Sequence, residues 1–141
     1  MQAQSIAQMF FECAASRGDT PAQLSKSPTA WEACSWQAMS DRVRSIALGL
    51  LALEVQLGDR VAILSDSRAE WVQCDLGILA TGAITIPIYP SSTDEQTAYI
   101  LNDSEVCIVF VDTPAQFDKL MRVRADTPTL QHVVVIDHAP A

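Results

Sequence analysis

Residues 81–101 read TGAITIPIYPSSTDEQTAYIL. The β-branched run Ile84 to Ile88 predicts a strand, and Thr93 to Asn102 has the pattern of a helix. Two prolines and several hydroxyl residues lie between them. A strand, a loop and a helix start in this order are typical of α/β proteins, which often bind phosphate at such a helix start. The stretch therefore predicts a fold class and raises the question of a phosphate site.

The same alternation continues on both sides of this stretch. We expect further strands at Val61 to Leu64, Val106 to Val111 and Val133 to Ile136, and further helices at Ala69 to Thr81 and Ala115 to Arg124. Continuous apolar strands are typical of a parallel sheet that is covered on both faces, and connecting helices imply right-handed crossovers. The predicted fold class is α/β, with a doubly wound, mostly parallel sheet built from βαβ repeats.

The N-terminal part has a different pattern. Apolar residues at helical spacing predict a helix at Ser5 to Ser16, and two short runs, Ala22 to Leu24 and Trp31 to Ser35, predict a small β-hairpin. A longer helix is expected from Trp36 to Leu53. At 141 residues we predict one domain, 1–141, with the first helix and hairpin in 1–35 and the βαβ core in 36–137.

Composition excludes several function classes. The chain has 17 acidic and 9 basic residues, and its net charge of −8 opposes binding to nucleic acid and to anionic lipid. The N-terminus has neither a basic n-region nor a long apolar core, so we expect no transmembrane segment and a cytoplasmic location. The four cysteines form no C-x-x-C pair. We expect them to be reduced and mostly buried.

The quoted stretch is a poor phosphate site. A phosphate loop uses glycines and often a lysine, whereas the only glycine here, Gly82, precedes the strand. The first helical turn carries Asp94 and Glu95, which would repel a phosphate. Thr93 and Gln96 fit a capping box, so structural capping is the favoured interpretation. We expect Pro87 and Pro90 to end the strand.

Two further motifs fail as binding sites. GILATG, Gly77 to Gly82, has the glycine spacing of a Walker loop, but Ala-Ile follows where Lys-Ser/Thr is required, and the motif lies in a helical pattern. The histidines, His132 and His138, flank the last strand at about 20 Å from each other if it is extended, too far to share a metal. The sequence predicts no P-loop and no metal site.

The remaining candidates are also better explained by structure. Asp66 and Asp112 follow two of the strands, as in a receiver domain, but the second acid and the lysine that a receiver needs are missing. We interpret both as loop or cap residues. The three tryptophans, Trp31, Trp36 and Trp71, are expected to pack in the core or between subdomains. We therefore predict no catalytic, cofactor-binding or metal-binding residue in this chain.

Taken together, three stretches resemble a known family. They are CSWQAM (34–39), GDRVAILSDSRAEW (58–71) and LATGAITIPIYPSSTDEQTAYILNDSE (79–105). The sequence resembles the N-terminal part of the AMP-forming acyl-CoA synthetases, in the adenylate-forming superfamily, and IPIYPSS followed by Gln-x-x-Tyr-Ile-Leu looks most like the long-chain fatty acid branch. Glu54 departs from the pattern where a helix-ending glycine is common, and Ser67 where asparagine is common.

The resemblance implies that this chain is the first subdomain of a longer enzyme and is inactive alone. The full-length enzyme would use ATP and magnesium to activate a fatty acid as an acyl-adenylate, which CoA then attacks to give a thioester. The resemblance places the phosphate loop and the adenine and ribose contacts downstream, so no cofactor is expected in this part. The expected partners are the missing C-terminal subdomains.

Two alternatives stay open at this point. One is a stand-alone, non-enzymatic binding or interaction module of the same fold, and the other is an unrelated flavodoxin-like or receiver-like domain. We also expect the chain alone to form a homodimer or larger assembly. Nearly half of its residues are hydrophobic, and surfaces that a second subdomain would cover tend to find a partner.

Overall fold

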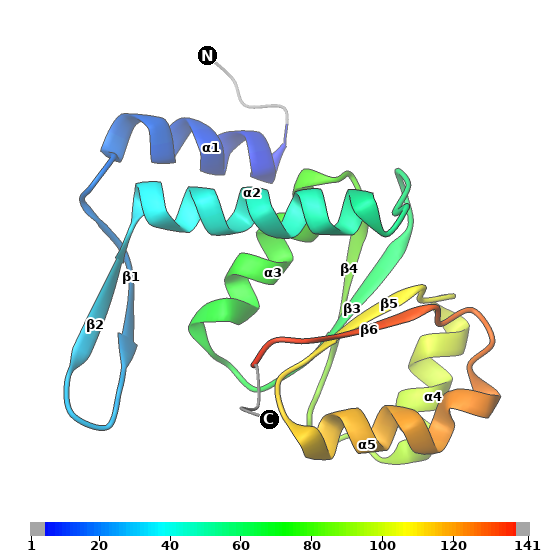
Figure 1. Ribbon diagram of the computed structural model, residues 1–141. Helices are drawn as coiled ribbons and strands as arrows, with labels where there is room; N and C mark the ends of the chain where they lie inside the picture. Colours follow the sequence, from blue (N-terminus) through cyan, green and yellow to red (C-terminus); the bar gives the residue numbers. More distant parts are fainter. Residues whose placement is uncertain (1–4, 138–141) are drawn as a thin grey trace. The chain divides into compact units, whose positions relative to one another are not determined.

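The computed structural model describes residues 5–137 and falls into two compact units. The first unit comprises the chain up to Leu57 together with Arg68–Gly82, and the second comprises Gly58–Ser67 together with the chain from Ala83 onward. The prediction of a single domain, 1–141, stays a prediction. Each unit is described by itself below, with the labels of Figure 1.

The first unit contains three helices and a hairpin. In chain order they are α1 (Ile6–Arg17), β1 (Pro21–Lys26), β2 (Trp31–Ser35), α2 (Trp36–Ala52) and α3 (Ala69–Ala80). The strands β1 and β2 pair antiparallel. Serine side chains cap two helices, because Ser5 accepts from the Gln8 N–H and Ser35 from the Ala38 N–H, both at 3.1 Å. The expected helices and hairpin are confirmed, with ends that differ by a few residues at most.

The core of the first unit forms where its helices meet. Phe10, Met39, Val43 and Leu76 make one buried cluster. The helices α2 and α3 approach closely at Gly77, where a Cβ atom would lie 2.5 Å from Cγ2 of Ile46. Since no side chain fits in that space, Gly77 is a packing residue of the helix crossing.

The second unit is a parallel sheet with two helices. Its strands are β3 (Arg60–Leu64), β4 (Ile84–Ile88), β5 (Ile108–Val111) and β6 (His132–Val135), and its helices are α4 (Asp94–Asp103) and α5 (Pro114–Val123), the latter followed by the short 3-10 turn η1 (Arg124–Asp126). The strand order is β4-β3-β5-β6, and all three pairings are parallel. The predicted α/β fold with a parallel sheet and a small hairpin is confirmed.

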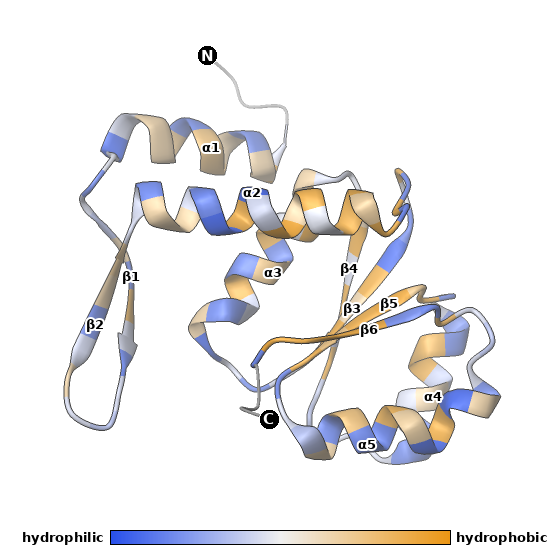
Figure 2. Ribbon diagram, in the orientation of Figure 1, coloured by the Kyte–Doolittle hydropathy of each residue, from blue (hydrophilic) through white to orange (hydrophobic). Residues whose placement is uncertain are grey.

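The hydrophobic strands explain the core of the second unit. Figure 2 shows apolar residues along β5 and much of β6, and alternating polar and apolar residues along α5. Leu101 of α4 and Leu120 of α5 pack against one face of the sheet, with its Ala62, Leu64, Ile88, Val109 and Val111. Val61, Ile63, Ile108 and Phe110 alternate with these residues and are also buried. Both faces of β3 and β5 are therefore buried, which explains their continuous apolar sequences.

One expectation about the quoted stretch is wrong. Pro87 does not end the strand, because β4 continues through it to Ile88. The strand β4 lies at an edge of the described sheet, with β3 as its neighbour. A proline is tolerated at an edge, where one side of the strand has no ladder partner that needs an N–H donor.

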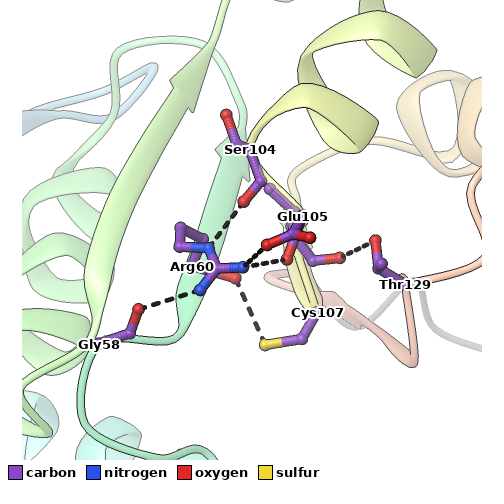
Figure 3. A network of polar contacts seen from close by, with 7 residues as sticks. Gly58, Arg60, Ser104, Glu105, Cys107 and Thr129 are labelled. Carbon is purple, nitrogen blue, oxygen red and sulfur yellow. Dashed lines mark hydrogen bonds and ion pairs between the residues drawn. The ribbon is translucent and has the colours of Figure 1, made fainter.

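Arg60 joins the beginning of β3 to the turn that follows α4 (Figure 3). Its Nε donates to the carbonyl of Ser104 at 2.7 Å, and its Nη2 pairs with Oε2 of Glu105 at 2.8 Å. Glu105 has a φ of 49°, a left-handed conformation that is uncommon for residues other than glycine. The contacts of Arg60 hold this turn against the sheet, at the amino end of β3.

Candidate functional site

Candidate polar residues gather where the strands of the second unit end. Asp66 lies just after β3, Tyr89 follows β4 directly, and Asp112 follows β5 directly. The chain runs from β3 to one side of the sheet for β4 and then to the other side for β5. Such a reversal makes a topological switch point between β3 and β5, and ligands of open α/β sheets bind outside the strand carboxyl ends at such points.

The two aspartates meet at this switch point. The backbone N–H of Asp66 donates to Oδ2 of Asp112 at 2.9 Å. Asp112 is only 5% exposed, and its Oδ1 is buried without a hydrogen-bond partner among the described residues. The interpretation of both as loop residues fits this geometry, since the Asp112 carboxylate links the loop after β3 to the end of β5. The side chain of Asp66 is exposed.

A metal does not fit this pair. Within residues 5–137, no group of three or more His, Cys, Asp or Glu side chains is arranged to hold a metal ion. Magnesium sites need several oxygen ligands in near-octahedral geometry. We therefore assign no metal-binding role to Asp66 or Asp112.

A pocket lies beside the carboxyl end of β4, lined by residues that follow this strand. Its volume is about 530 Å³, and it is lined by Tyr89, Ser91, Ser92, Glu95, Gln96, Tyr99 and Ile100. The two tyrosines are the only ones in the chain, and they are 82% and 68% exposed. Among these lining residues the one charged side chain is an acid, Glu95. The pocket offers aromatic rings, hydroxyls and a carboxylate, a combination that disfavours a phosphate.

The beginning of α4 is capped by its own side chains, as predicted. The hydroxyl of Thr93 accepts from the Gln96 N–H at 3.2 Å, and Oε1 of Gln96 accepts from the Thr93 N–H at 3.0 Å. These reciprocal bonds confirm the capping box. The first turn also carries Asp94 and Glu95. The positive end of the helix dipole is therefore already compensated.

Asp94 is bound by a residue of α5. Arg122 donates from Nε and Nη2 to the two carboxylate oxygens of Asp94, at 2.6 and 3.0 Å. The hydrogen bond from Arg122 lowers the pKa of Asp94 below its usual value, and the bond to Asp94 raises the pKa of Arg122. This bidentate pair connects the first turn of α4 to α5.

Lys119 of α5 binds the loop that forms one wall of the pocket. Its Nζ donates to the carbonyl of Pro90 at 2.8 Å and to the carbonyl of Ser92 at 2.6 Å. Gln116 adds a bond from Nε2 to the Pro90 carbonyl at 3.2 Å. This role of Lys119 was not predicted from the sequence, in which a lysine one turn before Arg122, on a helix that follows the loop, is only a weak signal for it.

The rejected motifs lie where helical and loop structure explain them. Gly77 is inside α3, and Gly82 follows α3 with a φ of 80°, so GILATG is a helix end and its turn. His132 begins β6 and is exposed. His138 lies outside the described residues.

The cysteines are free but less buried than expected. Cys74 is buried, whereas Cys13, Cys34 and Cys107 are half-buried, so the expectation that most are buried is wrong. Burial, together with the charge of Glu70, raises the pKa of Cys74 to about 12. Burial and the charge of Asp59 also raise the pKa of Cys107. Both thiols are poor nucleophiles at neutral pH.

The tryptophans divide into two environments. Trp36 packs beside Phe10, with ring centroids 6.0 Å apart, and the guanidinium of Arg17 lies 5.3 Å from the centre of its ring. Trp71 is half-buried. Trp31 is 67% exposed on the hairpin, so the expectation of core packing is wrong for this residue. Its position at the start of β2, next to the hairpin turn, explains the exposure.

Comparison with known proteins decides the family. A profile of the AMP-binding enzyme family matches residues 10–141. The chain belongs to the AMP-binding enzyme family. This membership excludes an unrelated flavodoxin-like or receiver-like domain.

Two relatives of this chain are named long-chain-fatty-acid–CoA ligases. A long-chain-fatty-acid–CoA ligase of Mycobacterium bovis, FadD15, is 39% identical over 106 residues, which cover 75% of this chain and 18% of the relative. The rat long-chain-fatty-acid–CoA ligase ACSBG1 is 31% identical over 136 residues, which cover 96% of this chain and 19% of the relative. The chain thus spans about a fifth of the length of these relatives.

Solved structures show the same fold. A Mycobacterium tuberculosis fatty acyl CoA synthetase aligns with a TM-score of 0.83 at 26% identity, over 94% of this chain and 26% of that one. The N-terminal domain of FACL13 from the same organism aligns with a TM-score of 0.86 at 23% identity, over 96% of this chain and 34% of that one. In both, the chain matches only part of the longer protein. Among the described residues, no helix is both long and apolar enough to cross a membrane.

Proposed function

We propose that residues 1–141 are the N-terminal part of an AMP-forming long-chain fatty acid CoA ligase. The observation that carries the proposal is the family match over residues 10–141, together with relatives of 31–39% identity that are named long-chain-fatty-acid–CoA ligases. In the proposed reaction the fatty acid carboxylate attacks the α-phosphate of ATP, which releases pyrophosphate and forms an acyl-adenylate. The thiol of CoA then attacks the acyl carbon, loses its proton and displaces AMP.

We infer that ATP and magnesium bind outside the described residues of this chain. The pocket beside β4 has an acidic side chain and no basic one among its lining residues, and the capping box occupies the N–H groups of Thr93 and Gln96 at the start of α4. We therefore assign the contacts to ATP, magnesium and the phosphates to the rest of the longer polypeptide, and no step of the reaction to a residue described here. The proposed role of this part is to supply the parallel sheet on which the remaining subdomains assemble.

The proposed partners follow from this role. The first is the C-terminal part of the same polypeptide, and the small-molecule partners are a long-chain fatty acid and CoA. We further propose that residues 1–141 alone form a homodimer or larger assembly, because apolar side chains such as Leu57 and Leu48 are exposed, at 85% and 60%. Size-exclusion chromatography with light scattering tests this, and a 15.3 kDa monomer at high micromolar concentration would contradict it.

We propose a cytoplasmic location and a place in fatty acid metabolism. All four cysteines are free, and free thiols are the rule in the reducing cytoplasm. Fractionation of cells that produce the full-length polypeptide with a tag tests the location. Recovery with secreted or periplasmic proteins would contradict it.

The test of the function is product formation by the full-length polypeptide. With ATP, magnesium, CoA and a long-chain fatty acid, the proposal predicts equal amounts of acyl-CoA and AMP. Each product should be absent when ATP or the fatty acid is left out. If fatty acid and CoA are bound but no AMP forms, the stand-alone binding module is the better explanation.

A further inference from the structure

The loop between β4 and α4 forms one wall of the pocket. It runs from Tyr89 to Thr93, and Tyr89, Ser91 and Ser92 contribute directly to the lining. The rest of the lining comes from α4, through Glu95, Gln96, Tyr99 and Ile100. The shape of the pocket therefore depends on how the loop is held relative to α4.

The loop has few contacts of its own that would fix it. Within the loop the Ser92 N–H donates to the Tyr89 carbonyl at 3.0 Å, and the last loop residue, Thr93, is fixed by the capping box. The carbonyls of Pro90 and Ser92 receive their bonds from α5 instead. Helix α5 is thus the element that sets the position of the middle of the loop.

Three side chains on successive turns of α5 make these contacts. Gln116, Lys119 and Arg122 are spaced by three residues, which places them on one face of the helix. Gln116 and Lys119 bind the loop, and Arg122 binds Asp94 at the start of α4. Together they hold the loop and the first turn of α4 in a fixed relation.

Lys119 is central among the three. It is half-buried, and its single ammonium group donates to two carbonyls two residues apart, at 2.8 and 2.6 Å. Hydrogen bonds from a charged donor are stronger than neutral ones. A shorter or apolar side chain at this position would leave the Ser92 carbonyl to water and the Pro90 carbonyl with the neutral donor Gln116 alone, so the loop would be held less firmly.

We propose that Lys119 is a positioning residue, which holds the loop of Tyr89 to Thr93 so that the pocket is formed before any ligand binds. Lys119 is not among the residues that line the pocket, and it acts on the pocket through its bonds to the carbonyls of Pro90 and Ser92. The site concerned is the pocket lined by this loop and α4, which lies within the second unit. Its kinetic consequence rests on the proposed ligase function, whereas its structural consequence does not.

The structural consequence can be read from the tyrosines. Because Tyr89 and Tyr99 are the only tyrosines, residues 1–141 labelled with 3-fluorotyrosine give two ¹⁹F resonances, one from each pocket wall. Tyr89→Phe and Tyr99→Phe assign them. We expect Lys119→Met to shift and broaden the Tyr89 resonance and to leave the Tyr99 resonance unchanged. Lys119→Arg, which keeps the charge and the donors, should restore the original signal.

The chain supplies a matched control. Lys26 is the only other lysine and is exposed on the hairpin strand β1. Lys26→Met should leave both resonances unchanged. Far-ultraviolet circular dichroism establishes that each variant is folded, and Lys119→Gln, which keeps one donor group, replaces Lys119→Met if the latter does not fold. An unchanged Tyr89 resonance in folded Lys119→Met or Lys119→Gln would overturn the proposal.

The kinetic consequence is tested in the full-length polypeptide. CoA and a long-chain fatty acid are varied in turn at saturating ATP, and Lys119→Met should raise the KM of one of them about fivefold while kcat stays unchanged. A fivefold change corresponds to about 1 kcal/mol. Lys26→Met should change neither constant. A fall in kcat with both KM values unchanged would contradict a positioning role.

The two tests separate the possible failures. If the polypeptide has no ligase activity but the Tyr89 resonance responds to Lys119→Met, the proposed function fails and the positioning role stands. If activity is present but neither the resonance nor any KM responds, the positioning role fails alone.

Discussion

The backbone N–H of Asp66 donates to Oδ2 of Asp112 across the switch point between β3 and β5, at 2.9 Å. The acceptor is a buried side chain, and the donor belongs to the backbone of an exposed loop residue. The bond therefore depends on the identity of Asp112 and not on the side chain of Asp66.

This asymmetry gives the first prediction. Asp112→Ala removes the acceptor and leaves the N–H without it, so we expect the free energy of unfolding to fall by about 1–3 kcal/mol. Asp66→Ala keeps the N–H and should change the free energy of unfolding by less than about 0.5 kcal/mol. Urea denaturation measures both values. Equal losses in the two variants would show that the Asp66 side chain has a role that the structure does not assign to it.

The second prediction concerns the glycine at the crossing of α2 and α3. Gly77→Ala would place a Cβ atom 2.5 Å from Cγ2 of Ile46, so we expect a loss of about 1–3 kcal/mol in the free energy of unfolding. Ile46→Ala in the same chain should recover part of that loss, because it removes the clashing atom. Gly49 is the control, since a Cβ there meets no atom within 4 Å.

We expect Gly49→Ala to leave stability unchanged or raise it by up to about 1 kcal/mol, as alanine favours a helix over glycine. Urea denaturation of Gly77→Ala, Ile46→Ala, their double variant and Gly49→Ala tests the packing argument. If Gly77→Ala and Gly49→Ala have the same effect, α2 and α3 do not approach as closely as described.

The third prediction is a pH dependence. Arg122 lowers the pKa of Asp94, so the pair stabilises the folded state above the ordinary aspartate pKa of about 3.9 and loses this effect as the pH falls through the lowered value. We expect Asp94→Asn to be less stable than the natural chain at neutral pH and equally stable in strong acid. Thermal unfolding from pH 7 to pH 2 measures the difference. High salt should reduce this difference in stability at pH 7. A difference in stability that grows as the pH falls would contradict the prediction.

The fourth prediction concerns a buried hydroxyl in α4. Thr97 is fully buried, and its Oγ1 has no hydrogen-bond partner among the described residues. Thr97→Val replaces the hydroxyl by a methyl group of similar size, so we expect the free energy of unfolding to stay unchanged or rise by up to about 1 kcal/mol. Chemical denaturation measures it. A loss of more than about 1 kcal/mol would mean that an ordered water binds the hydroxyl.

Much of the fold could be predicted from sequence because the local signals agree. The apolar runs of β3 and β5, the capping box at Thr93 and the helical spacing in α2 each indicate the element that forms there. Glu54 shows where local rules are weaker. It adopts a φ of 64° after α2, a conformation for which the sequence pattern expects glycine, so the chain keeps the turn geometry without the usual residue.

The candidate site was harder to predict because its parts are distant in sequence. Lys119 binds carbonyls 27 and 29 residues away, and backbone carbonyls have no sequence signature. The exposure of Trp31 was not predicted either. Side chains alternate between the two faces of a two-stranded hairpin, and this alternation does not tell which face packs against another element. The prediction for Pro87 was wrong because a strand tolerates a proline when it lies at the edge of the sheet, and the sequence does not show that β4 lies there.

The central claim is that residues 1–141 are a non-catalytic part of an AMP-forming ligase, and pyrophosphate release tests it most directly. The full-length polypeptide and residues 1–141 alone are each incubated with ATP and magnesium, in the presence and in the absence of a long-chain fatty acid. We predict that the full-length polypeptide releases pyrophosphate in a fatty-acid-dependent way and that residues 1–141 release none above the ATP-only background. Fatty-acid-dependent release by residues 1–141 alone, or its absence from the folded full-length polypeptide, would contradict the claim.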